Sequence, residues 1–305
     1  MSSPSPGALV KAMPAVFVLI WSTGFIVAKY GLPYAPPLTF LAIRYFLSIV
    51  CFLVWIVLAR AAWPRTGRQW LHLGVSGVLM HAAYLGGVWV AVKAGMGSGL
   101  TALIVGLQPV LTALWVSRMG ASGGVGHQES RVTTRQWLGL ALGLGGLLLV
   151  VWRKLGVGSE VTAFTLGAAV FALLSITAGT LYQKRFVKPA DVRSANAIQL
   201  AAALLLTLPL VFLESEAIVW NHQFLGAMAW SVLALTLGGS SLLYLLIQRG
   251  AATSVTSLLY LVPPTTAIMA WALFGEPITA ATVLGTALTA LGVSLVVRPA
   301  KLRVA

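Results

Sequence analysis

Two stretches of this sequence match in outline: GMGSGLTALIVGLQPVLTALWV (Gly95–Val116) and GAATSVTSLLYLVPPTTAIMAW (Gly250–Trp271). A shift of 155 positions aligns four identical pairs, Gly95 with Gly250, Thr101 with Thr256, Leu103 with Leu258 and Pro109 with Pro264. Each stretch is about as long as one bilayer-spanning helix, which needs ~20 residues. A proline inside such a helix frees a backbone carbonyl, which must be satisfied by neighbouring protein or by water in a cavity. We therefore expect both helices to line a shared space between two repeated halves.

The composition excludes an ordinary soluble domain. Apolar residues make up 59% of the 305 positions and charged residues only 9%, whereas soluble domains carry roughly 25% charged residues. The sequence therefore predicts an all-α polytopic membrane protein. The single cysteine, Cys51, lies in an apolar run, so no disulfide or metal framework is expected.

Ten apolar spans can be counted from their lengths and flanking breaks. They cover approximately 13–31, 36–59, 70–93, 96–118, 135–152, 162–183, 194–213, 224–247, 251–274 and 279–297. The run that follows Lys11 resembles a signal peptide, but it continues to Tyr30 without a clear small-residue cleavage site. We interpret it as the first spanning helix.

The distribution of Lys and Arg predicts the orientation. Fifteen of these residues fall with the termini and the even-numbered loops: Lys11, Arg60, Arg65, Arg68, Arg118, Arg131, Arg135, Lys184, Arg185, Lys188, Arg193, Arg249, Arg298, Lys301 and Arg303. Four fall on the opposite side: Lys29, Lys93, Arg153 and Lys154. The positive-inside rule then places both termini in the cytoplasm. The net charge of +14 is accounted for in this way, and no nucleic-acid partner is expected.

The repeat extends beyond the opening pair of stretches. At the same shift, Trp21–Gly24 meets Ile176–Gly179 and Lys29 meets Lys184, and at a shift of 146 the segment around Gly146 meets that around Gly292. Each half, 1–155 and 156–305, thus holds five spans. An odd number of spans inserts the second copy upside down, and such inverted repeats are frequent in secondary transporters.

Three groups of residues carry a resemblance to a known family: Trp21-Ser22-x-Gly24-Phe25 with Lys29, Arg44-Tyr45, and Gly275-Glu276-Pro277-Ile278 with Gly285 and Gly292. They resemble, respectively, the first-helix opening, the second-helix arginine and the glycine–glutamate signature of EamA-type members of the drug/metabolite transporter superfamily. The resemblance covers essentially the whole chain, and overall likeness is greatest to YddG-type amino-acid exporters. It implies a ten-helix, inverted-repeat carrier that exports small metabolites. The first half departs from the pattern, because it has no Gly-Glu pair after its fourth span and only Glu129 falls nearby.

No catalytic constellation is present in the sequence. The four histidines lie far apart, no Walker A loop occurs, and no Asp or Glu lies in the middle of a span. We expect no enzymatic activity, metal or cofactor. Coupling would have to use His81, a substrate gradient or another subunit.

Polar and aromatic side chains form stripes on several spans, and together they predict a central cavity for amino-acid-sized solutes. The candidate substrate-binding residues are Trp21, Phe25, His81, Tyr84, Thr101, Gln108, Ser175, Gly179, Tyr244, Gln248, Tyr260 and Pro263. The alternative is helix–helix packing, in which small and polar residues let backbones approach. For His81 the alternative is a neutral histidine bonded to a neighbouring helix.

Three charged residues are candidates for a gate or an ion pair: Arg44, Glu276 and Lys29. Arg44 lies roughly 12 Å into the second span at 1.5 Å per residue, where an unpaired guanidinium is costly. It could snorkel, pair with Glu276 or meet a substrate carboxylate. Lys29 lies at a span end, where snorkelling is the alternative to pairing.

The sequence features together with the family resemblance imply a transporter in the cell inner membrane, exporting amino acids (aromatic and other neutral ones) and related metabolites by alternating access. The alternative is a multidrug exporter of lipophilic cations with the same fold, which would need a membrane-embedded acid. A membrane-embedded enzyme would need His, Asp or Glu residues clustered at one membrane face, and the sequence has no such cluster. A channel is also conceivable, and saturable counterflow would distinguish a carrier from it. The expected partners are the small-molecule substrate and the bilayer; the oligomeric state stays open, with a monomer as one option.

Overall fold

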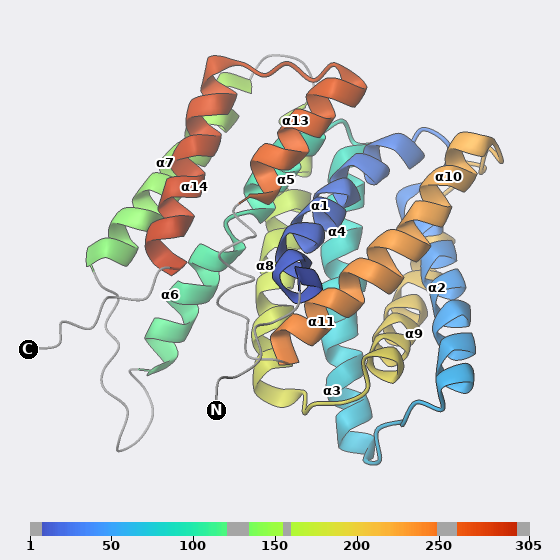
Figure 1. Cartoon of the computed structure of the whole chain (residues 1–305). Helices are drawn as coiled ribbons and strands as arrows, with labels where there is room; N and C mark the ends of the chain where they lie inside the picture. Colours follow the sequence, from blue (N-terminus) through green and yellow to red (C-terminus); the bar gives the residue numbers. More distant parts are fainter. Residues whose placement is uncertain (1–7, 121–133, 155–159, 249–260, 298–305) are drawn as a thin grey trace, which may run out of the picture.

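The computed structural model describes residues 8–120, 134–154, 160–248 and 261–297, and within these ranges it holds helices and no strand (Figure 1). Six helices are long and apolar enough to cross a membrane: Pro37–Ala59, Gly67–Lys93, Trp137–Lys154, Ala163–Phe186, Val192–Val211 and His222–Leu245. Four shorter apolar helices accompany them: Val16–Gly31, Ser98–Thr112, Val262–Phe274 and Ala280–Leu295. The all-α class is confirmed for the described residues, while the count of ten spans stays a prediction.

The described helices follow one another along the chain. In order they are α1 (Ala8–Gly31), α2 (Pro37–Ala59), α3 (Gly67–Gly77), the π-helix η1 (Val78–Ala83), α4 (Tyr84–Lys93), α5 (Ser98–Val105), α6 (Gln108–Gly120), α7 (Thr134–Lys154), α8 (Ala163–Phe186), α9 (Val192–Val211), α10 (His222–Trp230), the π-helix η2 (Ser231–Ser240), α11 (Ser241–Gln248), α13 (Val262–Phe274) and α14 (Ala280–Val297).

Two long helices contain a π-helical segment in their middle. The first, α3–η1–α4, has it at 78–83, and the second, α10–η2–α11, has it at 231–240. The 155-position shift that aligns the two halves of the sequence carries 78–83 onto 233–238, which lies within the second π segment. Such segments are rare and often occur at functional sites.

The predicted fourth span is broken at Gly106 and Leu107, which separate α5 from α6. Pro109 explains the break, because it lacks the N–H that would bond the carbonyl four residues earlier. Pro263 and Pro264 similarly lie in the first turn of α13. A Cβ atom on Gly106 would lie 2.7 Å from Cγ of Pro263, so the two proline-containing turns are in direct contact.

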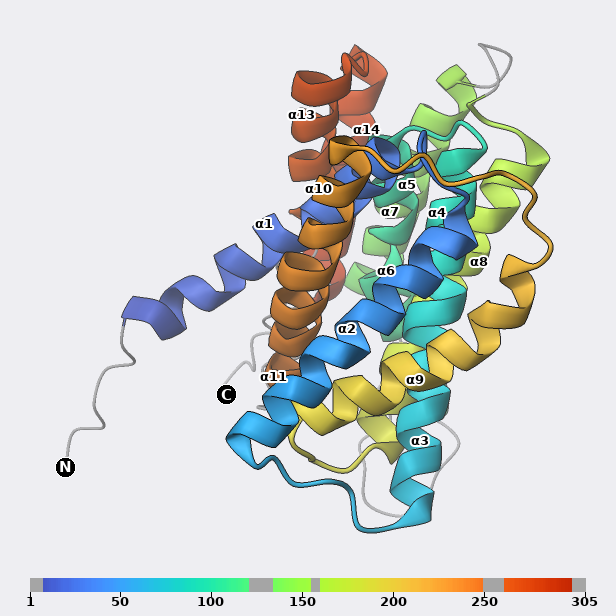
Figure 2. The same cartoon turned by 90° about the vertical axis from the view of Figure 1, so that its right-hand side faces the viewer.

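Helices α7 and α14 lie side by side at one edge of the molecule (Figures 1 and 2). A Cβ on Gly146 would come within 2.4 Å of the carbonyl oxygen of Gly285, and one on Gly292 within 2.4 Å of that of Gly139. Glycine on both helices therefore lets the backbones touch, as in other close helix pairs of membrane proteins.

The main core lies on the other side of the molecule, where α2 and α9 cross next to α4 and α8 (Figure 2). Its centre is aromatic: the ring of Phe40 lies 4.4 Å from that of Trp89 and 5.5 Å from that of Phe224, measured between centroids. Large apolar side chains such as Leu205 and Phe212 point outward and are exposed. An apolar exterior of this kind suits contact with lipid.

Candidate functional site

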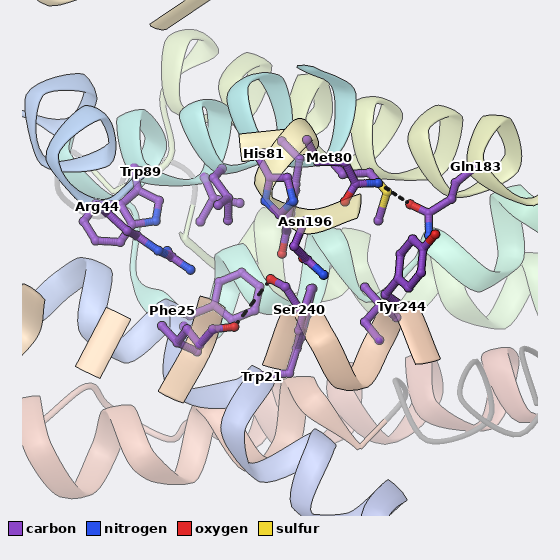
Figure 3. Close-up of a pocket in the computed structure, with 17 residues that line it drawn as sticks. Trp21, Phe25, Arg44, Met80, His81, Trp89, Gln183, Asn196, Ser240 and Tyr244 are labelled. Atoms are coloured by element: carbon purple, nitrogen blue, oxygen red, sulfur yellow. Dashed lines mark hydrogen bonds between the residues drawn. The ribbon is translucent and has the colours of Figure 1, made fainter. Parts of the chain in front are cut away.

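A cavity of about 680 Å³, part of it continuous with solvent, lies inside the bundle (Figure 3). Its walls come from α1, α2, the α3–η1–α4 helix, α8, α9 and the α10–η2–α11 helix. The lining residues are Trp21, Gly24, Phe25, Arg44, Met80, His81, Tyr84, Leu85, Val88, Trp89, Gln183, Asn196, Gln199, Leu235, Ser240, Leu243 and Tyr244.

Aromatic rings form much of the cavity wall. Trp21 and Phe25 lie one turn apart on α1, Tyr84 and Trp89 lie on α4, and Tyr244 comes from α11 on the facing side. Figure 3 shows rings from these helices around the same space. The cavity therefore offers large apolar contact area to a solute.

A group of amide side chains from α8 and α9 lines part of the cavity. Nε2 of Gln199 donates to Oγ of Ser76 at 2.8 Å and to Oε1 of Gln183 at 3.1 Å. Nδ2 of Asn196 donates to the carbonyl of Val192 at 2.7 Å, while its Oδ1 has no hydrogen-bond partner among the described residues. The sequence reasoning missed all three amides. Asn196 and Gln199 lie three residues apart on an apolar helix, a polar pair that would have indicated them.

Arg44 reaches the cavity from α2 and is 5% exposed. Its Nε donates to Oγ1 of Thr236 at 3.0 Å, and that hydroxyl donates in turn to the carbonyl of Ser231 at 2.9 Å. Ser231 lies five residues before Thr236, which is the π-helical spacing. The π segment η2 therefore fixes the acceptor that orients the guanidinium.

His81 lies in η1 and borders the cavity. Its backbone carbonyl accepts from the hydroxyl of Tyr45 at 2.8 Å, and the two rings meet edge to face at 6.4 Å. Together with Trp21, Phe25, Tyr84 and Tyr244, it belongs to the predicted binding residues that the structure brings together.

The structure places several of the other predicted binding residues outside this cavity. The hydroxyl of Thr101 bonds the carbonyl of Gly97 at 2.9 Å, and Nε2 of Gln108 donates to Thr180 at 2.9 Å. A Cβ on Gly179 would lie 2.5 Å from Cγ of Met80, a packing contact. Four of the set remain. Ser175 is buried on α8, Pro263 packs on Gly106, and Gln248 is the last residue of α11, with a side chain that is not described. Tyr260 lies outside the described residues.

The candidate gate residues separate into two places. Nζ of Lys29 forms an ion pair with Oε1 of Glu276 at 2.6 Å, whereas Arg44 bonds Thr236. The pairing follows from position, because Glu276 lies two residues after the end of α13 and Lys29 lies near the end of α1, while Arg44 lies two turns inside α2. Glu129 is outside the described residues.

Two glutamates hold the start of α5. Glu276 accepts from the backbone N–H groups of Ser98 at 3.0 Å and Gly99 at 3.4 Å, and Glu160 accepts from that of Gly97 at 3.1 Å. Glu160 also pairs with Lys154 at 2.6 Å. Carboxylates are favourable at a helix N-terminus, where free N–H groups and the helix dipole present positive charge. The cluster joins α1, α5, α7 and α13 at one end of the bundle.

A sequence model of the EamA-like transporter family matches residues 12–152 and again residues 163–298. This chain belongs to the EamA-like transporter family. The match confirms the resemblance noted from the sequence, and it identifies a transporter of the drug/metabolite superfamily rather than an enzyme.

The names of three relatives agree with this assignment. The uncharacterized inner membrane transporter YedA of Escherichia coli K12 is 25% identical over 277 residues, covering 88% of this chain and 84% of its own. An uncharacterized transporter of Archaeoglobus fulgidus is 24% identical over 287 residues, covering 92% and 94%. A probable amino-acid metabolite efflux pump of Salmonella typhimurium is 27% identical over 192 residues, covering 63% and 59%.

A solved crystal structure shares the fold of this chain. Its TM-score is 0.68 at 17% sequence identity, with 95% of this chain and 98% of the other covered. At that identity the likeness concerns the fold alone.

Proposed function

We propose that this EamA-family chain exports amino acids, aromatic and other neutral ones included, and related small metabolites across the inner membrane. The observation that carries the proposal is the cavity, which combines aromatic walls, amides and one guanidinium and is lined by no carboxylate among the described residues. Aromatic walls suit apolar side chains, and the amides and guanidinium suit the polar ends of an amino acid. The efflux pump of Salmonella typhimurium, whose printed name concerns amino-acid metabolites, agrees with this substrate class.

Transport would proceed by alternating access between two inverted halves, 1–155 and 156–305. The packing of the helices supports this division, because α7 packs on α14, α5 on α13 and α2 on α9. The contact of α8 with α4 has its counterpart in the contact of α1 with α10 and η2. The two family matches also fall one on each side of the boundary. A site between such halves is typical of secondary transporters.

The orientation that we propose keeps both termini in the cytoplasm. Of the four basic residues on the opposite face, Lys29, Lys93 and Lys154 pair with Glu276, Glu216 and Glu160 at 2.6, 2.5 and 2.6 Å. The positive-inside rule counts Lys and Arg and gives acids little weight, so the proposed orientation rests on the count of fifteen basic residues against four. The glutamate cluster around α5 would then close the outer end of the solute path.

Proteoliposomes test the proposal. Purified protein is reconstituted with a high internal concentration of phenylalanine or leucine, and entry of the labelled amino acid is followed with and without a proton gradient. We expect saturable counterflow that unlabelled neutral amino acids inhibit. Rates equal to those of empty liposomes would refute the proposal, and inhibition by lipophilic cations alone would favour a multidrug exporter.

A further inference from the structure

Arg44 is a buried cation whose side chain has no carboxylate partner among the described residues. Its guanidinium has five N–H donors, and it stays charged at any physiological pH. A single neutral acceptor, the hydroxyl of Thr236, takes one of those donors. A charge inside a membrane protein is normally paired with an opposite charge or turned to a water-filled path.

The acids of this chain are committed elsewhere. Six Asp and Glu residues occur in the sequence, and five of them lie in the described part. Those five bind other groups: Glu160 and Glu276 hold α5 with Lys154 and Lys29, Glu216 pairs with Lys93, Glu214 accepts from the backbone of Leu38 and Thr39, and Asp191 pairs with Arg193. The described structure therefore places no acid of its own against Arg44.

The guanidinium borders the same cavity as the aromatic wall (Figure 3). Thr236 and the π-helical bond beneath it hold Nε in place, which leaves the two terminal nitrogens of the fork for another group. A planar guanidinium of this kind matches a carboxylate through two parallel hydrogen bonds. Burial strengthens such a pair, since water competes less for it.

We propose that Arg44 is the carboxylate receptor of the cavity and selects solutes that combine a carboxylate with an apolar or aromatic side group. The proposal rests on the proposed function and narrows its substrate class. Trp21, Phe25 and Tyr244 would take the apolar group while Arg44 takes the charge. Solutes that carry only positive charge are then disfavoured, because they would meet a buried guanidinium of the same sign.

Four related probes test this selection. Phenylalanine and N-acetylphenylalanine keep the carboxylate, whereas phenylalanine methyl ester and phenylethylamine lack it. Binding to the purified full-length protein is measured by thermal stabilisation in detergent, at constant salt. A charge-assisted hydrogen bond contributes about 1.5–3 kcal/mol, which corresponds to about 10- to 100-fold in affinity. We expect the two acids to bind at least about tenfold more tightly than the ester and the amine.

Variants test whether the difference in affinity between the acids and the other two probes depends on Arg44. In Arg44→Gln the preference for the acids should fall to within about threefold, and Arg44→Lys should retain part of it. Arg65→Gln removes the same charge from an exposed loop residue and should leave the preference unchanged. The wild-type comparison stands without any variant, so a poorly folded Arg44→Gln does not prevent a decision.

The outcomes separate this inference from the proposed function. If the ester and the amine bind wild type as tightly as the acids, the receptor role of Arg44 is refuted while amino-acid export stands. A preference that survives intact in Arg44→Gln refutes it equally. If no probe binds and none crosses in proteoliposomes, the proposed function itself is refuted together with the inference.

Discussion

Two cations on the first two helices have opposite surroundings. Lys29 of α1 has a carboxylate at 2.6 Å, and that carboxylate also binds the N-terminus of α5. Arg44 of α2 has a hydroxyl at 3.0 Å and a cavity beside it. The charge of Lys29 helps to join three helices to one another. The charge of Arg44 is oriented by Thr236 and faces the cavity. A satisfied charge indicates structure, whereas an incompletely satisfied one indicates a ligand.

The largest expected loss of stability concerns the ion pair of Lys29. Glu276→Gln removes the charge that Lys29 and the N–H groups of Ser98 and Gly99 share. Losing charge-assisted hydrogen bonds at a helix N-terminus should lower the free energy of unfolding by roughly 2–3 kcal/mol. Thermal unfolding in detergent measures this, with the accessibility of a cysteine placed near α5 as a second readout.

Glu216→Gln is the matched control for that variant. Its carboxylate also pairs with a lysine, at 2.5 Å, but its side chain is 60% exposed. Exposed pairs contribute about 0–1 kcal/mol, so the loss should be below about 1 kcal/mol. Equal losses in the two variants would mean that Glu276 is an ordinary surface pair.

Gly97→Ala tests the same cluster from the backbone side. A Cβ at this position would lie 2.5 Å from Oε1 of Glu160 and 2.9 Å from Oε2 of Glu276. Both carboxylates would have to withdraw, at a cost of about 1–3 kcal/mol in stability, as overpacking usually causes. Gly167→Ala on α8, where no atom lies within 4 Å, should cost nothing. A harmless Gly97→Ala would contradict the close approach of both glutamates.

Thr236→Val sharpens the other side of the comparison. It removes the acceptor that orients the Arg44 Nε but leaves the charge in place, so binding of phenylalanine should weaken about fivefold, or about 1 kcal/mol. Thr177→Val is the control, because its hydroxyl bonds the carbonyl of Leu173 within α8 and does not line the cavity. If both variants lose the same affinity for phenylalanine, Thr236 has no specific role in orienting Arg44.

The smallest expected effect concerns the pair of Asp191 and Arg193 at the start of α9. The hydrogen bond from Arg193 lowers the pKa of the Asp191 carboxyl from its ordinary value of 3.8. Folding therefore favours the ionised form, and the stabilisation is present above pH 3.8 and lost as the pH falls through the lowered pKa. We expect Asp191→Asn to melt slightly below wild type at pH 7, by less than about 1 kcal/mol in free energy, and the two curves to converge in acid. A constant gap across that range would contradict this assignment.

Periodicity and composition predicted much of the fold because a bilayer imposes long apolar runs. The break before Pro109 could also be anticipated, because proline removes a specific hydrogen bond. The π segments could not, because their sequences, VLMHAA and SVLALTLGGS, have no pattern that distinguishes them from an α-helix. Their geometry depends on contacts such as that of Thr236 with Ser231 across five residues.

The candidate site was predicted only in part. Polar and ionisable groups in apolar helices, such as those of Trp21, His81 and Arg44, could be predicted as candidates because exposing them to lipid costs free energy. Thr101 and Gln108 followed the same logic and lie elsewhere, because a hydroxyl or amide can be satisfied by its own or a neighbouring helix. Stripes on one helix do not specify which neighbour they face, and that information comes only from the packing.

The glycine contacts between α7 and α14 limit how the carrier can move. Because the backbone of Gly146 lies directly against that of Gly285, we expect the two helices to move together as one unit. In a rocking motion between the halves, this helix pair would then lie at the rotation axis. Spin labels on α7 and α14 should keep a constant separation while labels across the cavity change theirs, and the pair would be the steadiest reference for following the transport cycle.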